Sequence, residues 1–200
     1  MKDRVLVAIT GGIGSGKTTV SKLIKESGFK VFSCDEIYKE IAETPAYLNL
    51  LKKIFPFAFD DNNEFNRKEL AKVVFSDPIQ LKKLNDLSHP IILSELESKI
   101  CNENGLIFCE VPLLFEGSLQ DKFDDILIVS RPLPLRLDAI VERDGITKED
   151  ALKRIKNQFN YENLNDFPAN YFIIDNNAGI QKLKIQVQNL IEKLIVKHNL

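Results

Sequence analysis

A glycine-rich segment near the start of the chain constrains the fold more than any other feature of the sequence. Within Gly11-Gly-Ile-Gly-Ser-Gly-Lys-Thr18, the residues Gly11, Gly16, Lys17 and Thr18 fit the pattern G-x-x-x-x-G-K-[ST]. A β-branched apolar run precedes the segment and apolar positions at helical spacing follow it, which is typical of a strand, a turn and a helix. Glycines let successive backbone N–H groups face a phosphate chain, and the helix N-terminus attracts the same anion. The segment therefore predicts a nucleoside triphosphate site; the alternative is a glycine-rich turn with a surface lysine.

The same pattern predicts a role for each polar member of the loop. Lys17 would reach the β- and γ-phosphates, and the Thr18 hydroxyl would occupy one coordination position of Mg²⁺. The residues that we expect to bind the nucleotide are Gly14, Ser15, Gly16, Lys17, Thr18 and Thr19.

Strands and helices alternate along the rest of the chain. Apolar runs at about 4–10, 30–33, 106–111, 125–130 and 171–175 predict five strands with helical stretches between them. Near-continuous apolar runs suit a parallel sheet that helices cover on both faces. We therefore expect an α/β fold of the P-loop NTPase type, a doubly wound parallel five-stranded sheet, in a single domain over residues 1–200. Extra helices between the second and third strands would cover the substrate side, and the long one is expected to be bent or broken near His89-Pro90.

Composition excludes several classes of protein. A formal net charge of -2 does not suggest a broad nucleic-acid surface, and no apolar run approaches the length of a membrane span. The three cysteines form no CxxC pair, which argues against a disulfide framework or a cysteine metal site. We expect a cytoplasmic protein whose partners are small molecules, with neither nucleic acid nor membrane among them; the sequence does not indicate an oligomeric state.

Two carboxylates follow predicted strands, where ligands bind in open α/β sheets. Asp35 comes after the second strand and could accept the proton of an attacking hydroxyl group. An equally plausible role is that Asp35 only caps the helix that follows. Glu110 ends the third strand and could hold a metal-bound water; a carboxylate that faces solvent at the sheet edge is at least as plausible.

Arginines are concentrated in one part of the chain. Of the six arginines, four lie between residues 131 and 154. The planar guanidinium group suits bidentate contacts to phosphate, and arginines above the loop would stabilise transition-state charge. Arg136 and Arg143 are seven residues apart and hence on one helix face, so they are the preferred pair. The alternative is that several of the four lie on solvated helix faces.

One tetrapeptide suggests a different class of protein. Thr147-Lys-Glu-Asp150 resembles the [NT]-K-x-D signature of GTP-dependent switches. The chain has no D-x-x-G sequence, and the tetrapeptide falls where a helix is expected to start, so we interpret it as a capping box.

Together with these features, further segments make nearly the whole chain resemble the dephospho-coenzyme A kinase family. The most distinctive is Val111-Pro-Leu-Leu-Phe-Glu116, besides the loop itself. The other matching segments are Ser33-Cys34-Asp35, Asn66-Arg67, His89-Pro90, Arg136-Leu137, Arg143, Arg154-Ile155 with Gln158, and Tyr171 to Asn176. Two departures from the family pattern are Ser33, where the family has a first aspartate, and Phe55-Pro56, where it usually has Phe-Gly.

The resemblance implies an activity and a division of the chain. It implies ATP as donor, Mg²⁺, and the ribose 3′-hydroxyl of dephospho-coenzyme A as acceptor, which is the last step of coenzyme A biosynthesis. It also implies a core of about 1–35, 105–130 and 168–200, a helical substrate insertion of about 36–104, and a helical lid of about 131–160. In this scheme Asn176 lies on the adenine side.

The expected roles of the remaining residues follow the resemblance. Lys17, Asp35, Arg136 and Arg143 would be catalytic. Asp35, Arg67, His89 and Leu113 would bind the acceptor, although His89 could instead only break a helix. Another small-molecule kinase of the shikimate or nucleoside monophosphate type is the nearest alternative, and a nucleotide-dependent switch is a more distant one.

Overall fold

The computed structural model describes residues 4–74, 76–161 and 170–200. Two of the predicted core segments, 1–35 and 168–200, begin at residues outside these described ranges.

The chain divides into two compact units. One consists of Met1–Ser33 and Glu103–Leu200 and is called the sheet unit here; the other, Cys34–Asn102, is called the helical unit. The boundaries of the helical unit fall within a few residues of the expected insertion at 36–104. The assignment of that insertion to substrate binding stays a prediction.

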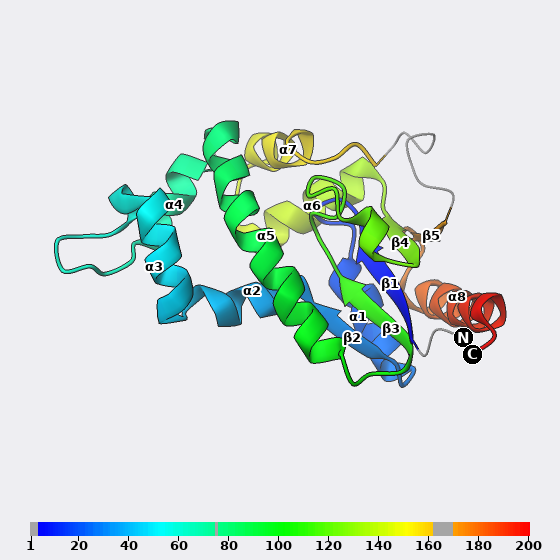
Figure 1. Ribbon diagram of the computed structural model, residues 1–200. Coiled ribbons are helices and arrows are strands. Elements are labelled where there is room, and N and C mark those ends of the chain that lie inside the picture. Colours follow the sequence, from blue (N-terminus) through cyan, green and yellow to red (C-terminus); the bar gives the residue numbers. More distant parts are fainter. Residues whose placement is uncertain (1–3, 75, 162–169) are drawn as a thin grey trace. The chain divides into compact units, whose positions relative to one another are not determined.

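The sheet unit contains the five-stranded parallel sheet that the sequence predicts, so the expected fold class is confirmed (Figure 1). The strands run in the order β2-β3-β1-β4-β5, and every neighbouring pair is parallel. The central strands are buried along most of their length because they are continuous apolar runs. The strand bounds are β1 Arg4–Thr10, β2 Lys30–Ser33, β3 Gly105–Glu110, β4 Asp125–Ser130 and β5 Tyr171–Asp175.

Helices of the sheet unit pack on this sheet and build its core. Val5, Val7 and Ile9 alternate along β1 and therefore point to one face, where they join a buried cluster with Val20 of α1 and Leu183 of α8. The helices of this unit are α1 Lys17–Glu26, α6 Leu133–Asp144, α7 Lys148–Lys156 and α8 Ile180–His198, with a short 3₁₀ turn at Gln120–Lys122. Thr147 caps α7 by accepting a hydrogen bond from Asp150 N–H, as the capping-box interpretation expects.

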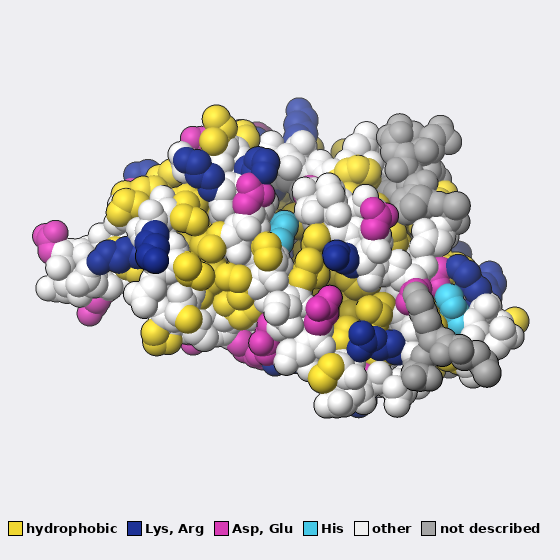
Figure 2. Space-filling model, viewed as in Figure 1, with side chains coloured by type: hydrophobic (Ala, Val, Ile, Leu, Met, Phe, Trp, Pro, Cys, Tyr) yellow, Lys and Arg dark blue, Asp and Glu magenta, His cyan; other side chains and the backbone are white. Residues whose placement is uncertain are grey.

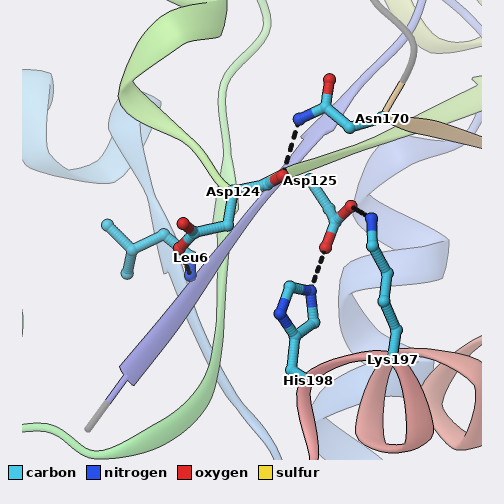
Figure 3. A network of polar contacts seen from close by, with 6 residues as sticks. All are labelled: Leu6, Asp124, Asp125, Asn170, Lys197 and His198. Atoms are coloured by element: carbon cyan, nitrogen blue, oxygen red, sulfur yellow. Dashed lines mark hydrogen bonds and ion pairs between the residues drawn. The ribbon is translucent and has the colours of Figure 1, made fainter. Parts of the chain in front are cut away.

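A polar network ties the end of α8 to the amino end of the sheet (Figure 3). The fully buried carboxylate of Asp125, the first residue of β4, is paired with Lys197 and His198 in the last turn of α8. Beside it, the Asp124 carboxylate accepts a hydrogen bond from Leu6 N–H at 2.9 Å. Because the strands are parallel, this network lies at the opposite end of the strands from the glycine-rich loop.

The helical unit consists of helices joined by short connections. Its elements are α2 Cys34–Ala42, α3 Pro45–Ile54, the 3₁₀ turn η1 Pro56–Ala58, α4 Arg67–Val74 and α5 Pro78–Ile100. Side-chain caps begin three of them: Thr44 accepts from Tyr47 N–H, Asn66 from Glu69 N–H at 3.1 Å, and Asp77 from Ile79 N–H at 2.8 Å. Figure 2 shows hydrophobic side chains on the surface of this unit, where α3 and η1 expose Leu50, Ile54 and Phe57.

Of the two expected outcomes at His89-Pro90, a break in the helix is wrong, and a bend stays a prediction. A single helix, α5, continues through Pro90 for 23 residues. An interior proline removes one backbone hydrogen bond and costs about 3 kcal/mol. Contacts with α2, α3 and α4 along α5 offset that loss, so tertiary packing overrides the local preference. Among the described residues, no helix is long and apolar enough to cross a membrane.

Candidate active site

The glycine-rich loop leaves β1 at the carboxyl edge of the sheet and leads directly into α1. Gly16 is the N-cap of α1 with φ 95°, a left-handed conformation that favours glycine. The Asn176 side chain, which directly follows β5, donates a hydrogen bond to the Ser15 carbonyl at 2.8 Å. A side chain at position 16 would overlap that amide group. The loop is therefore held against the chain that follows β5.

Lys17 lies across the loop. Its Nζ donates to the carbonyl groups of Gly11, at 2.7 Å, and Gly12, at 3.3 Å. The neighbouring Thr18 and Thr19, on the first turn of α1, are exposed.

Donor groups at the N-terminus of α1 are left for a ligand. Among the described residues, the buried Ser15 hydroxyl has no hydrogen-bond partner and no side chain caps the helix. Within the residues that the structure describes, no hydrogen bond engages the N–H groups of Gly16 and Thr18. A buried hydroxyl donor and unpaired N–H groups at a helix N-terminus, with a nearby lysine, fit the phosphate chain of a nucleotide.

Glu110 is buried beneath the first turn of α1. Only 7% of the residue is exposed, so the alternative of a solvent-facing carboxylate is wrong. Its Oε1 accepts a hydrogen bond from Thr18 Oγ1 at 3.1 Å, and its Oε2 accepts one from Ser21 Oγ at 2.7 Å. Because Thr18 donates its proton to Glu110, its oxygen lone pairs stay available to a cation. A role of Glu110 toward a metal-bound water stays a prediction.

Arg136 lies directly on the loop. It is buried, and its Nε donates to the Ile13 carbonyl at 3.0 Å. Gly12 gives the guanidinium group room, because a side chain there would overlap it. At Gly14, an added Cβ would come within 2.7 Å of the Arg136 carbonyl oxygen. The fit of α6 against the loop therefore depends on two small residues.

Arg143 lies elsewhere, although it shares a helix face with Arg136. Its guanidinium group binds Asp144 through Nε, at 2.7 Å, and Nη2, at 3.0 Å, and Arg154 reaches the same carboxylate at 2.7 Å. The Arg143 hydrogen bond, with Arg154 adding to it, lowers the pKa of Asp144 below its usual value. Seven residues are two helix turns, about 10 Å along the axis, so a shared face does not bring two side chains to one site.

Arg131, which is not a member of the expected pair, also contacts the loop. Its Nη1 donates to the Gly14 carbonyl at 3.2 Å, and its Nε is buried without a partner among the described residues. Arg131 directly follows β4, at the edge where residues after strands gather. The rule that singled out Asp35 and Glu110 would have singled out Arg131 as well.

The expected acceptor residues are distributed over both units. Asp35 is the second residue of α2, in its first turn, and it is exposed; its role as a base or as a helix cap stays a prediction. Arg67 is the first residue of α4, and His89 lies within α5. Leu113 belongs to the sheet unit, in the turns after β3, and is partly buried.

A buried hydroxyl pair lies beside His89 in the sequence. The Tyr47 hydroxyl is hydrogen-bonded to Ser88 at 2.7 Å. Burial raises the pKa of Tyr47 far above its usual value, and the positive charge of Arg67 opposes part of that rise. Arg67 therefore lies within electrostatic range of this pair in the helical unit.

A parallel sheet with a phosphate-binding loop after its central strand, and with arginines on the carbonyl groups of that loop, defines a P-loop kinase. The family model described as dephospho-CoA kinase matches residues 5–182 of the chain. The chain belongs to the dephospho-CoA kinase family, which confirms the family predicted from the sequence.

Individual relatives agree with the family assignment. The chain is 35% identical over 195 residues to a dephospho-CoA kinase of Fusobacterium nucleatum, covering 95% of this chain and 98% of the relative. A crystal structure from Thermus thermophilus matches with a TM-score of 0.83 and 31% identity, covering 96% of this chain and 99% of that one. The dephospho-CoA kinase of Campylobacter jejuni matches with a TM-score of 0.69 and 27% identity, covering 98% and 100%.

Proposed function

We propose that this protein transfers the γ-phosphoryl group of ATP to the ribose 3′-hydroxyl of dephospho-coenzyme A, the step that completes coenzyme A. The observation that carries the proposal is the phosphate loop with two arginines on its carbonyl groups, in a chain that matches the dephospho-CoA kinase family over residues 5–182. The cytoplasmic location and the absence of nucleic-acid partners stay predictions.

On the donor side, the first turn of α1 would hold the phosphates. The buried Ser15 hydroxyl and the N–H groups at the helix start are donors that need an acceptor. Lys17 would exchange its two loop carbonyls for phosphate oxygens. The Thr18 hydroxyl, oriented by Glu110, would hold Mg²⁺, whose charge favours phosphoryl transfer when the ion is bound. Asn176 would lie on the adenine side.

On the acceptor side, Asp35 would take the proton of the 3′-hydroxyl. Its carboxylate is exposed, and it comes two residues after Ser33, whose Cα pairs in register with Glu110. A carboxylate so close in the chain to the carboxyl edge of the sheet suits a general base. Arg67, His89 and Leu113 would bind the rest of the acceptor.

The charge that develops on the transferring group would be stabilised by Lys17 and Arg136. Arg136 already lies on the loop. Arg143 would contribute after turning away from Asp144, which binds its Nε and Nη2.

An ADP-release assay with several acceptors tests the activity. We expect turnover with ATP and dephospho-coenzyme A, and little with adenosine, AMP or shikimate. Faster turnover with shikimate or AMP would indicate another small-molecule kinase. Equal binding of GTP and ATP without acceptor-dependent turnover would indicate a switch protein.

The variant Asp35→Asn tests the proposed base. We expect turnover to fall about 100-fold or more, because a positioned base contributes that much, while the Kd for ATP stays unchanged. Glu36→Gln, which removes the adjacent exposed carboxylate of α2, is the matched control and should keep near-normal turnover. Near-normal turnover of Asp35→Asn would overturn the assignment.

A further inference from the structure

Side chains of residues 158–161, which follow α7, are hydrogen-bonded to the region of the phosphate loop. The Gln158 Oε1 accepts a hydrogen bond from Ile13 N–H, in the middle of the loop, at 2.6 Å. The Tyr161 hydroxyl is hydrogen-bonded to the hydroxyl of Thr10, the last residue of β1, at 3.0 Å. These side chains therefore reach the loop from a part of the chain about 145 residues away.

The same residues are anchored on their other side by the turns after β3. The Phe159 ring stacks on Phe115 with centroids 4.6 Å apart, and Phe159 N–H donates to Glu116 Oε1 at 2.9 Å. The Tyr161 ring completes the cluster, 5.9 Å from Phe115 and 5.3 Å from Phe159. Phe115 and Glu116 are the last two residues of the distinctive Val111–Glu116 segment, so this segment contacts residues 158–161 directly.

Both backbone polar groups of Ile13 are held by side chains from beyond β4. Gln158 accepts from its N–H, and Arg136 donates to its carbonyl. A glycine-rich loop has many accessible conformations, and ordering each residue costs about 1–2 kcal/mol. Groups that hold the loop before the nucleotide arrives spare that cost during binding. Burial also raises the pKa of Tyr161, so its hydroxyl stays protonated and uncharged beside Thr10.

We propose that Gln158 and Tyr161 are positioning residues for the donor site, and that Phe115 and Glu116 hold them in place. Gln158 and Tyr161 fix Ile13 and Thr10 on either side of the first glycines, so that the loop is ordered for the triphosphate. This inference rests on the proposed function for its nucleotide and extends it: the Val111–Glu116 segment serves the donor half of the reaction through residues 158–161.

Two variants that remove only the polar groups test the inference. Gln158→Met keeps the length of the side chain without its acceptor, and Tyr161→Phe removes one hydroxyl. We expect each to raise the Kd of the intact protein for MgATP, measured by calorimetry without acceptor, about 3- to 10-fold, the usual effect of one hydrogen bond. Gln188→Met, on the exposed face of α8, is the matched control and should leave the Kd unchanged.

Additional measurements separate positioning from a purely structural role. The melting temperatures of both variants should stay close to that of the parent, and the KM for the acceptor should stay within about twofold. Phe115→Leu combined with Gln158→Met should weaken MgATP binding less than the sum of the two single effects, because both act through the same residues. A lower melting temperature with unchanged Kd for MgATP, or no change in either, would overturn the inference. The Kd for MgATP is measured without an acceptor, so this experiment tests the inference even if dephospho-coenzyme A proves not to be the substrate.

Discussion

At the scale of single residues, Glu110 combines two hydroxyl contacts in a buried place. Thr18 and Ser21 are three residues apart on α1, so their side chains lie on one face and reach the two oxygens of one carboxylate. Ser21 cannot contact a nucleotide from its buried position, but it determines how Glu110 points. The orientation of the Thr18 hydroxyl therefore depends on a residue one turn away.

Ser21→Ala should weaken the proposed magnesium site without removing a ligand. A hydrogen bond to a charged group is worth about 1.5–3 kcal/mol, so we expect the Mg²⁺ concentration for half-maximal activity to rise about 10-fold. Mg²⁺ titrations of turnover at saturating substrates measure this. Ser27→Ala, which removes a hydroxyl bound to the Leu23 carbonyl at the far end of α1, should leave the titration unchanged. The same curve for Ser21→Ala and the parent would contradict the role of Ser21.

Sequence patterns located the residues of the loop better than they located the groups around it. The loop motif is local, so its position after β1 and before α1 follows from the chain itself. The contacts of Arg131 and Gln158 with the loop depend on tertiary packing that residue spacing does not contain. For Arg143 the spacing predicted a contact with the loop that the described residues do not make, because the neighbouring Asp144 binds its guanidinium group.

At the scale of elements, the five strands lie where the apolar runs predict them. The helix α5, in contrast, continues through Pro90, where the proline predicts that it could break. The central strands are buried on both faces of the sheet, and such burial requires runs of apolar residues that are visible in the sequence. A proline in the sequence indicates only that one backbone hydrogen bond of the helix is lost. Whether Pro90 breaks the helix depends on what the other residues of α5 pack against, and that is not readable from the spacing.

The last turn of α8 contributes a second feature at this scale. Lys197 lies at a helix C-terminus, where its positive charge is favoured, and both Lys197 and the neighbouring His198 are paired with Asp125 (Figure 3). The exposed fractions are unequal: 42% for the Lys197 side chain, 20% for the His198 side chain and 0% for Asp125. The cost of breaking the network should therefore depend on which side is removed.

We expect Lys197→Met combined with His198→Leu to lower the free energy of unfolding by about 3–5 kcal/mol, because a buried carboxylate then lacks its partners. Asp125→Asn should cost less, since water can solvate the two remaining side chains. Urea unfolding of the three proteins measures the difference. Lys193→Met, one turn earlier on the exposed face, is the control, and the Kd for ATP should not change in any variant. Equal losses for the double variant and Asp125→Asn would contradict this asymmetry.

At the scale of the whole molecule, the strand order requires a long crossover between β2 and β3. β2 and β3 are parallel neighbours, so the chain must return from the carboxyl end of β2 to the amino end of β3. Residues 34–102 make that crossover, and they are long enough to form a compact unit of their own. The sequence predicted the extra helices between these strands, but a two-unit division depends on contacts that only the folded chain has.

The two units should respond separately to the two substrates in hydrogen exchange. A ligand at 100 times its Kd stabilises the state that binds it by about 2.7 kcal/mol, and local unfolding reports which part is stabilised. Because the phosphate loop belongs to the sheet unit, MgATP alone should slow exchange of the amides of β1 and α1 far more than those of α3 and α5. Addition of dephospho-coenzyme A should then slow exchange in the helical unit, which contains Asp35, Arg67 and His89.

Lys17→Ala should lose the response to MgATP and serves as the control. Equal protection of both units by MgATP alone would show that they unfold as one cooperative body.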